Sequence, residues 1–128
     1  MGFFADLFGL KRRRRPRIGT RWYVDLRVPD TPSYVGFFTR DVAVTGVRLE
    51  GEDEAAFRRH LTEEGTADLR IRIPGRPGVI EVAAELRWAL SGGEKFLTGW
   101  MFTDLDEDDA AALEGYIDAH PELHLKRD

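Results

Sequence analysis

Two short stretches of the sequence combine residue types that could hold an anionic, aromatic ligand. The first, residues 11–17, reads KRRRRPR and contains six cations in seven residues. A guanidinium group can form two parallel hydrogen bonds with phosphate oxygens or with a guanine edge, and it can also stack on a purine face. The second stretch, residues 41–46, reads DVAVTG. Its carboxylate can accept hydrogen bonds from base N–H groups, and its glycine permits a positive φ and a close approach of the backbone to a ligand.

The distribution of charge along the chain favours a small, local anion over a long polyanion. Residues 1–21 carry seven Lys and Arg against one acidic residue, whereas the remaining 107 residues carry twelve against twenty-two, so the net charges are +6 and −10. Proteins that bind nucleic-acid duplexes usually neutralise many phosphates over one basic face. The acidic body opposes such binding, and no aromatic residues alternate with the arginines to stack on bases. The sequence therefore predicts no specific nucleic-acid binding.

Other residue types that carry chemistry are few or poorly placed. The chain has no cysteine, which excludes disulfides, thiolate metal sites and cysteine nucleophiles and fits a reducing compartment. Ser33 and Ser91 lie in turn contexts without a nucleophile elbow. Pro121 interrupts the helix that would bring His120 and His124 together as metal ligands. The sequence therefore predicts no catalytic residues and no metal site.

The two ligand-like stretches must be positioned by short strands, because apolar and polar residues alternate with period two after Pro16. Turns rich in Gly and Pro separate these segments. The longest alternation predicts one buried face made of Ile80, Val82, Ala84, Leu86, Trp88 and Leu90. Strands are expected within residues 22–28, 34–51, 69–73, 80–90 and 95–102, with a break near residues 41–46. Such a series predicts an antiparallel barrel or sandwich.

Helical spacing is expected in three places. Residues 105–118 should form a closing helix with Asp106 as its N-cap. Its predicted apolar face consists of Leu105, Ala112, Leu113, Tyr116 and Ile117. Residues 52–64 break the strand rhythm and predict a short helical insert, and residues 1–10 predict a short amphipathic segment.

The N-terminal segment admits two interpretations. Phe3, Phe4, Leu7 and Phe8 share one side, and they could dock on the chain's own domain or on a protein partner. Alternatively, they could insert into an anionic membrane while residues 11–15 contact lipid phosphates. The segment lacks the features of a secretory signal, and the chain has no run of about 18 apolar residues. The predicted location is cytoplasmic, with peripheral attachment to the inner membrane left open.

Taken together, the two stretches resemble the signature of the PilZ domain, the bacterial receptor module for cyclic di-GMP. That family carries R-x-x-x-R before the first strand and [D/N]-x-S-x-x-G on adjacent barrel strands. The strand at residues 99–102 and the acidic helix start after it resemble the end of that domain, so the resemblance covers residues 11–118. The residues that match or align with the signature are Arg12, Arg13, Arg17, Asp41, Ala43 and Gly46.

The resemblance implies a mainly β fold: a six-stranded antiparallel barrel with a C-terminal α-helix. This domain would occupy residues 11–118, preceded by the segment 1–10 and followed by a tail at residues 119–128. It also implies a non-enzymatic effector that uses cyclic di-GMP as a ligand and no cofactor. Binding would change the N-terminal segment and a surface read by a protein partner, whose identity the sequence does not predict.

The resemblance also implies a role for each matching residue. Arg13 and Arg17 would engage guanine and phosphate, with Arg12 adding a phosphate or stacking contact. Asp41 would bind a guanine edge, and Gly46 would leave space for the ligand.

Ala43 departs from the family's serine and removes a hydroxyl group from the expected site. One net hydrogen bond contributes about 0.5–1.5 kcal/mol, so this change is expected to weaken binding roughly two- to tenfold without abolishing it. The alternative interpretation is a degenerate PilZ interaction adaptor that works without ligand, either with or without attachment to a membrane through residues 1–15.

Overall fold

The computed structural model describes residues 16–27, 34–52, 65–92 and 95–125 of the 128-residue chain. The predicted helices at residues 1–10 and 52–64 lie outside the described residues, except for Glu52. The described elements are β2 (Ile18–Gly19), β3 (Tyr23–Arg27), β4 (Tyr34–Ala43), β5 (Gly46–Gly51), β6 (Thr66–Ile71), β7 (Ile80–Gly92), β8 (Lys95–Phe102), α3 (Glu107–Ala119) and a 3-10 turn (Pro121–Leu123).

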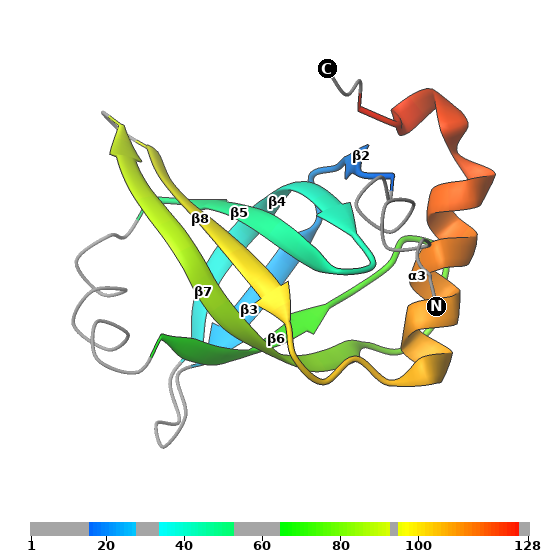
Figure 1. Cartoon of the computed structure of the whole chain (residues 1–128), viewed down its shortest axis with the longest axis horizontal. Helices are drawn as coiled ribbons and strands as arrows, with labels where there is room; N and C mark the ends of the chain where they lie inside the picture. Colours follow the sequence, from blue (N-terminus) through cyan, green and yellow to red (C-terminus); the bar gives the residue numbers. More distant parts are fainter. Residues whose placement is uncertain (1–15, 28–33, 53–64, 93–94, 126–128) are drawn as a thin grey trace, which may run out of the picture.

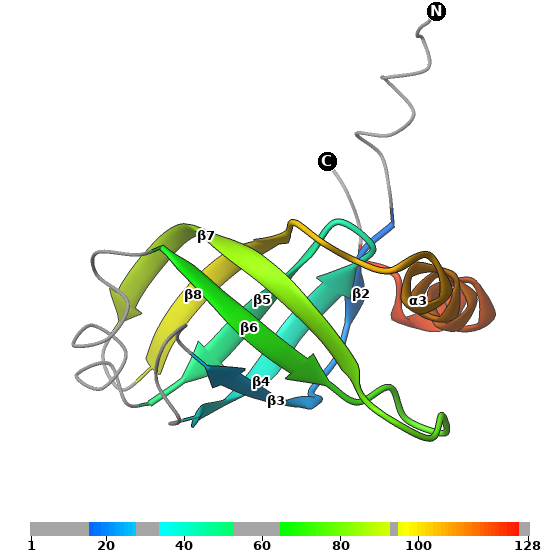
Figure 2. The same ribbon diagram turned by 90° about the horizontal axis from the view of Figure 1, so that it is seen from below.

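Six of the strands form a closed antiparallel barrel, as the resemblance implies. The hydrogen-bonded order is β4, β3, β6, β7, β8, β5, and β5 pairs back with β4. The two-residue strand β2 extends this sheet by pairing with the end of β4, where Ile18 faces Val42. Helix α3 lies at the end of the barrel where β2 also lies (Figures 1 and 2). The fold is therefore mainly β with one C-terminal helix.

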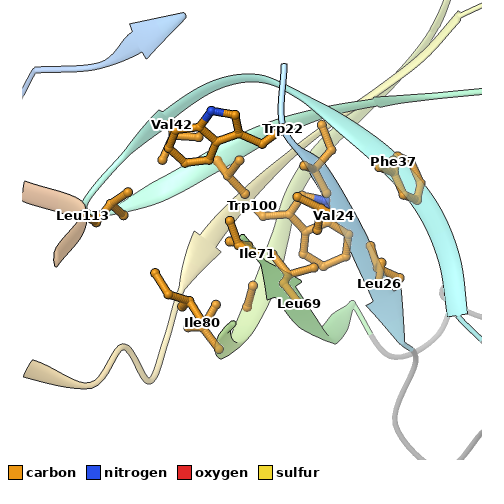
Figure 3. Packing of buried hydrophobic residues seen from close by; sticks show 14 of the residues in the cluster. Trp22, Val24, Leu26, Phe37, Val42, Leu69, Ile71, Ile80, Trp100 and Leu113 are labelled. Carbon is orange, nitrogen blue, oxygen red and sulfur yellow. The ribbon is translucent and has the colours of Figure 1, made fainter. Parts of the chain in front are cut away.

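The inward-facing residues of each strand meet in one apolar core (Figure 3). In β3, Val24 and Leu26 are fully buried while Tyr23, Asp25 and Arg27 are at least partly exposed, which is the expected period-two pattern. Helix α3 closes the end of this core with Leu113 and Ile117. The helix is also held by an edge-to-face contact between the rings of Tyr116 and Trp22, whose centroids are 5.2 Å apart.

The predicted buried face of residues 80–90 is wrong beyond Leu86. Leu86 pairs with Trp100 and Trp88 pairs with Gly99, so Arg87 is an extra residue that forms a β-bulge. A bulge shifts the alternation by one residue. Trp88 and Leu90 are consequently exposed on the outer face of the barrel, and Ala89 packs against the core instead.

The N-cap of α3 gives a first testable prediction. The Asp106 carboxylate accepts a hydrogen bond from the backbone N–H of Asp108 at 3.0 Å, as predicted. Asp106→Ala is therefore expected to lower the free energy of unfolding by about 1 kcal/mol in urea denaturation. Asp104→Ala removes the same charge without removing the cap, so an equal loss in both variants would contradict the capping role.

Candidate ligand-binding site

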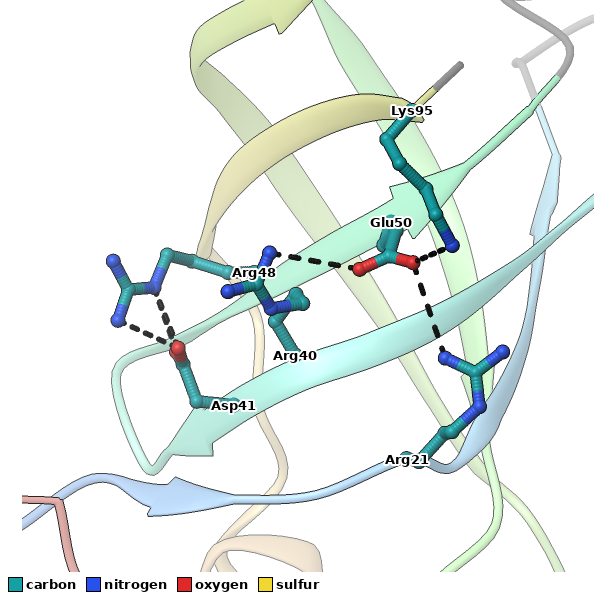
Figure 4. Close-up of polar contacts among 6 residues, drawn as sticks. All are labelled: Arg21, Arg40, Asp41, Arg48, Glu50 and Lys95. Atoms are coloured by element: carbon teal, nitrogen blue, oxygen red, sulfur yellow. Dashed lines mark hydrogen bonds and ion pairs between the residues drawn. The ribbon is translucent and has the colours of Figure 1, made fainter. Parts of the chain in front are cut away.

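The outer face of the β4–β5 hairpin holds a buried carboxylate between two arginines. Asp41 pairs in register with Arg48 across the hairpin. The guanidinium of Arg48 approaches both carboxylate oxygens: Nε lies 2.9 Å from Oδ1 and 2.7 Å from Oδ2, and Nη2 lies 2.6 Å from Oδ2 (Figure 4). Only 5% of the Asp41 side chain is exposed, against 46% for Arg48. This planar, bidentate pair fixes the orientation of the carboxylate.

The second arginine comes from the chain that precedes β2. Arg17 Nη1 donates to Asp41 Oδ1 at 2.6 Å, although the two residues are 24 positions apart. The pairing of β2 with β4 explains this contact, because Gly19 faces Asp41 in the register. The structure thus brings together Arg17 and Asp41, one residue from each of the two motifs. Arg12 and Arg13 lie outside the described residues.

Thr39, a buried residue of β4, holds the short segment between β2 and β3 (residues 20–22) against that strand. Trp22 donates its backbone N–H to Thr39 Oγ1 at 2.7 Å, and the hydroxyls of Thr20 and Thr39 lie 2.6 Å apart. The backbone continues this contact, since Thr20 N donates to Arg40 O and Thr39 N donates to Trp22 O. These bonds fix the segment that follows β2, and they therefore help to position Arg17 beside β4.

Ala43 and Gly46 face each other at the end of the same hairpin, where the chain turns at Val44 and Thr45. Ala43 is buried, so it is not an exposed contact surface in this state. Gly46 does not have a positive φ; the described glycines that do are Gly65, Gly75 and Gly78. The reason for glycine at position 46 is steric, because a Cβ there would collide with the backbone carbonyl of Trp100 on β8.

A second charged cluster lies farther along the same outer face. Glu50 accepts a hydrogen bond from Lys95 Nζ at 2.5 Å and lies 3.5 Å from Arg40 and 4.0 Å from Arg21 (Figure 4). The hydrogen bond from Lys95 lowers the pKa of Glu50; burial opposes this shift, and the charges of the three cations add to it. The groove beside this cluster has a volume of about 410 Å³ and is lined partly by Tyr34 and Phe38.

The two clusters together make this face basic within an acidic protein. Each carboxylate is outnumbered by its cations, and the seven side chains sum to +3. The two acidic side chains are Asp41 and Glu50, and the five basic ones are Arg17, Arg21, Arg40, Arg48 and Lys95. Such a face attracts a small anion.

An exposed tryptophan ends a row of register partners that crosses four adjacent strands, from Asp41 on β4 through Arg48 and Gly99 to Trp88 on β7. Arg48 pairs with Gly99 on β8, and Gly99 pairs with Trp88 on β7. Gly99 has no side chain, and the Trp88 indole occupies the space that a Cβ at Gly99 would need. The indole is 38% exposed. Trp88 and Arg48 are both absent from the residues that the sequence motifs singled out.

The described residues contain no group of three or more His, Cys, Asp or Glu side chains that could hold a metal ion. The two tail histidines contact separate backbone carbonyls, His120 Nδ1 that of Tyr116 and His124 Nε2 that of Ile117, each at 2.8 Å. In the part of the chain that the structure describes, no helix has both the length and the apolar character needed to cross a membrane.

Solved structures with this architecture include proteins that share little sequence with the chain. Bacillus subtilis MotI/DgrA, described as an inhibitor of motility, superposes with a TM-score of 0.70 and 19% identity over 87% of this chain and 52% of that one. The chain therefore spans about half of that protein. The PilZ domain of Escherichia coli YcgR, solved with c-di-GMP, superposes with a TM-score of 0.63 and 17% identity over 87% of this chain and 96% of that domain.

A further structure, the MrkH–c-di-GMP complex of K. pneumonia, gives a TM-score of 0.64 with 17% identity over 87% of this chain and 52% of that one. No curated protein sequence shows a significant match to the chain. The family model for the PilZ domain matches residues 11–119. Because that match spans most of the 128 residues and the barrel with its closing helix agrees with it, the chain belongs to the PilZ domain family.

Proposed function

We propose that this chain is a non-enzymatic effector that binds cyclic di-GMP on the outer face of β4 and β5, around Asp41. The observation that carries the proposal is the buried Asp41 carboxylate, which is held between arginines from two separate segments. Support comes from the family match and from the YcgR and MrkH relatives, whose structures contain c-di-GMP.

The chemistry of the cluster suits a ligand that has both guanines and phosphates. Arg17 and Arg48 are 27% and 46% exposed, so they can turn toward phosphate oxygens or toward guanine O6 and N7 without a rearrangement of the barrel. Asp41 would then accept hydrogen bonds from the Watson–Crick N–H groups of a guanine. Ligand donors would replace arginine donors at the carboxylate, so no buried charge is left unpaired during the exchange.

The remaining motif residues have smaller roles in this proposal. Arg12 and Arg13 would add guanine, phosphate or stacking contacts from the segment before Arg17. Ala43 contributes no hydroxyl, which accounts for an expected affinity below that of a site with serine. Gly46 allows the hairpin to lie close to β8, and in this proposal it would also leave space for the ligand.

Trp88 would serve as a stacking platform at the far end of the row. Trp88 on β7 lies two strands away from Arg48 on β5 and three strands away from Asp41 on β4. Stacking of a base on an aromatic ring contributes about 1–3 kcal/mol. A cyclic dinucleotide has two bases, so one guanine could bind at Asp41 while the other reaches toward the indole.

Effector action would follow from a change in the position of the arginine segment when ligand binds. A ligand that binds Arg17 together with Arg12 and Arg13 favours the arrangement in which this segment lies on the barrel, and it can shift the equilibrium only by its difference in affinity for the two arrangements. The N-terminal residues then change position relative to the barrel, and a protein partner reads the new surface.

Isothermal titration calorimetry with Arg48→Ala tests the part of this site that the sequence motifs did not include. Loss of hydrogen bonds to a charged group is expected to weaken cyclic di-GMP binding by about 10- to 150-fold. Arg27→Ala is the matched control, because Arg27 also pairs with an aspartate on a neighbouring strand, Asp68, at 2.8 Å. Equal affinity in the Arg48 variant and the wild-type chain would exclude Arg48 from the site.

A further inference from the structure

The C-terminal tail contacts the same segment that carries Arg17. The backbone N–H of Leu125 donates to the carbonyl oxygen of Arg17 at 2.8 Å, and His124 forms an isolated antiparallel bridge with Ile18. In Figures 1 and 2 the end of the described chain lies beside β2, which agrees with this bridge. Strand β2 is therefore held on one side by β4 and on the other by the tail.

The tail is in turn held by the end of α3. His124 Nε2 lies 2.8 Å from the carbonyl oxygen of Ile117, and the backbone N–H of His120 donates to the same oxygen at 3.2 Å. Since a carbonyl can only accept, the Nε2 atom of His124 carries the donated proton. These bonds satisfy a carbonyl that the helix end leaves without an intrahelical partner. The position of the tail thus follows from the position of the helix.

Arg17 is consequently fixed at two points. Its carbonyl is held by the tail, and its guanidinium is held by Asp41. The Leu125 side chain also lies beside Gly19, 3.4 Å from where a Cβ at that position would be, which is an ordinary van der Waals distance. Only the hydrogen bond between the Leu125 N–H and the Arg17 carbonyl would remain unchanged on ligand binding, since the guanidinium must turn from Asp41 to the ligand.

We infer that His124 and Leu125 are positioning residues for Arg17, so that docking of the tail and binding of cyclic di-GMP support each other. The inference rests on the proposed function. A backbone that is already fixed when the ligand arrives reduces the entropy that binding must otherwise overcome. Coupling between two sites is reciprocal, so the ligand must also stabilise the docked tail by the same factor.

The backbone N–H of Leu125 can be removed without changing the charge of the tail. Leu125→Pro eliminates the N–H that bonds to Arg17, and the residue before it, His124, already has the extended angles that a following proline requires, φ −63° and ψ 133°. Leu125→Ala retains the N–H and serves as the matched control. We expect Leu125→Pro to weaken cyclic di-GMP binding by about 5- to 50-fold in calorimetry and Leu125→Ala to weaken it by less than about threefold.

A double-mutant cycle with Arg17→Ala separates positioning from a general structural effect. If the tail acts through Arg17, Leu125→Pro has no further effect on affinity once Arg17 is alanine. Hydrogen exchange supplies the reciprocal readout, in which the ligand should slow exchange of the tail amides in the wild-type chain and not in Leu125→Pro.

The outcomes distinguish this inference from the proposed function. No binding of cyclic di-GMP by the folded wild-type chain would overturn both. Binding by the wild-type chain with equal affinity in Leu125→Pro, or an equal loss in both Arg17 backgrounds, would overturn the positioning role alone.

Discussion

Asp41→Ala is expected to weaken cyclic di-GMP binding by about 10- to 150-fold, because it removes the acceptor for the guanine N–H groups and leaves hydrogen bonds to a charged group unmade. The carboxylate is also the common partner of Arg17 and Arg48, so its loss releases both cations from their observed positions. Asp41→Asn retains one acceptor oxygen and is expected to lose less affinity. The measurement is the affinity for cyclic di-GMP of the wild-type chain, Asp41→Ala and Asp41→Asn, determined by calorimetry at a fixed salt concentration.

The structure supplies a matched control for this variant. Asp68 forms a cross-strand ion pair with Arg27 on the outer face of β6 and β3, so Asp68→Ala makes the same chemical change at a site away from Asp41. We expect its affinity to equal that of the wild-type chain. Full binding by Asp41→Ala, or an equal loss in both variants, would show that Asp41 does not recognise the ligand.

Gly46→Ala is expected to destabilise the barrel by about 1–3 kcal/mol, since the new methyl group would collide with the Trp100 carbonyl and force β5 away from β8. The colliding group is backbone within a closed sheet, so it cannot rotate aside as a side chain would. The free energy of unfolding from urea denaturation is the measurement.

Gly115→Ala provides the opposite expectation within the same protein. Gly115 lies in α3, and a Cβ there would meet nothing within 4 Å. Alanine in place of a glycine inside an exposed stretch of helix stabilises by about 0.5–1 kcal/mol, chiefly because glycine loses more backbone entropy on folding. A Gly46→Ala protein as stable as the wild type would contradict the steric explanation and favour a role for Gly46 at the ligand.

Several features of the site could be predicted from the sequence because they depend on local rules. Alternation of apolar and polar residues predicts that Val24 and Leu26 face the core, as they do. The two motifs single out Arg17 and Asp41 as residues of one site, although they do not predict the ion pair between them. Arg48 could have been found as well. Once the turn is assigned to Val44 and Thr45, antiparallel register requires that Arg48 face Asp41.

The remaining features depend on contacts between segments that are distant in the sequence. The bulge at Arg87 exposes Trp88, yet the residues around it follow an unbroken alternation, so nothing in that pattern marks the extra residue. The close approach of β8 explains Gly46 only after the barrel is closed. The bridge between His124 and Ile18 joins nearly opposite ends of the chain, and no periodicity predicts it.

The most direct test of the account is a calorimetric titration of the full 128-residue chain with cyclic di-GMP, alongside 5′-GMP and the linear dinucleotide pGpG. We predict saturable binding of cyclic di-GMP that weakens as salt rises, because the site carries a net positive charge. Neither control should bind as tightly, since GMP has one base and pGpG lacks the closed ring. Absence of saturable binding by the folded chain, or equal affinity for all three compounds, would contradict the proposed function.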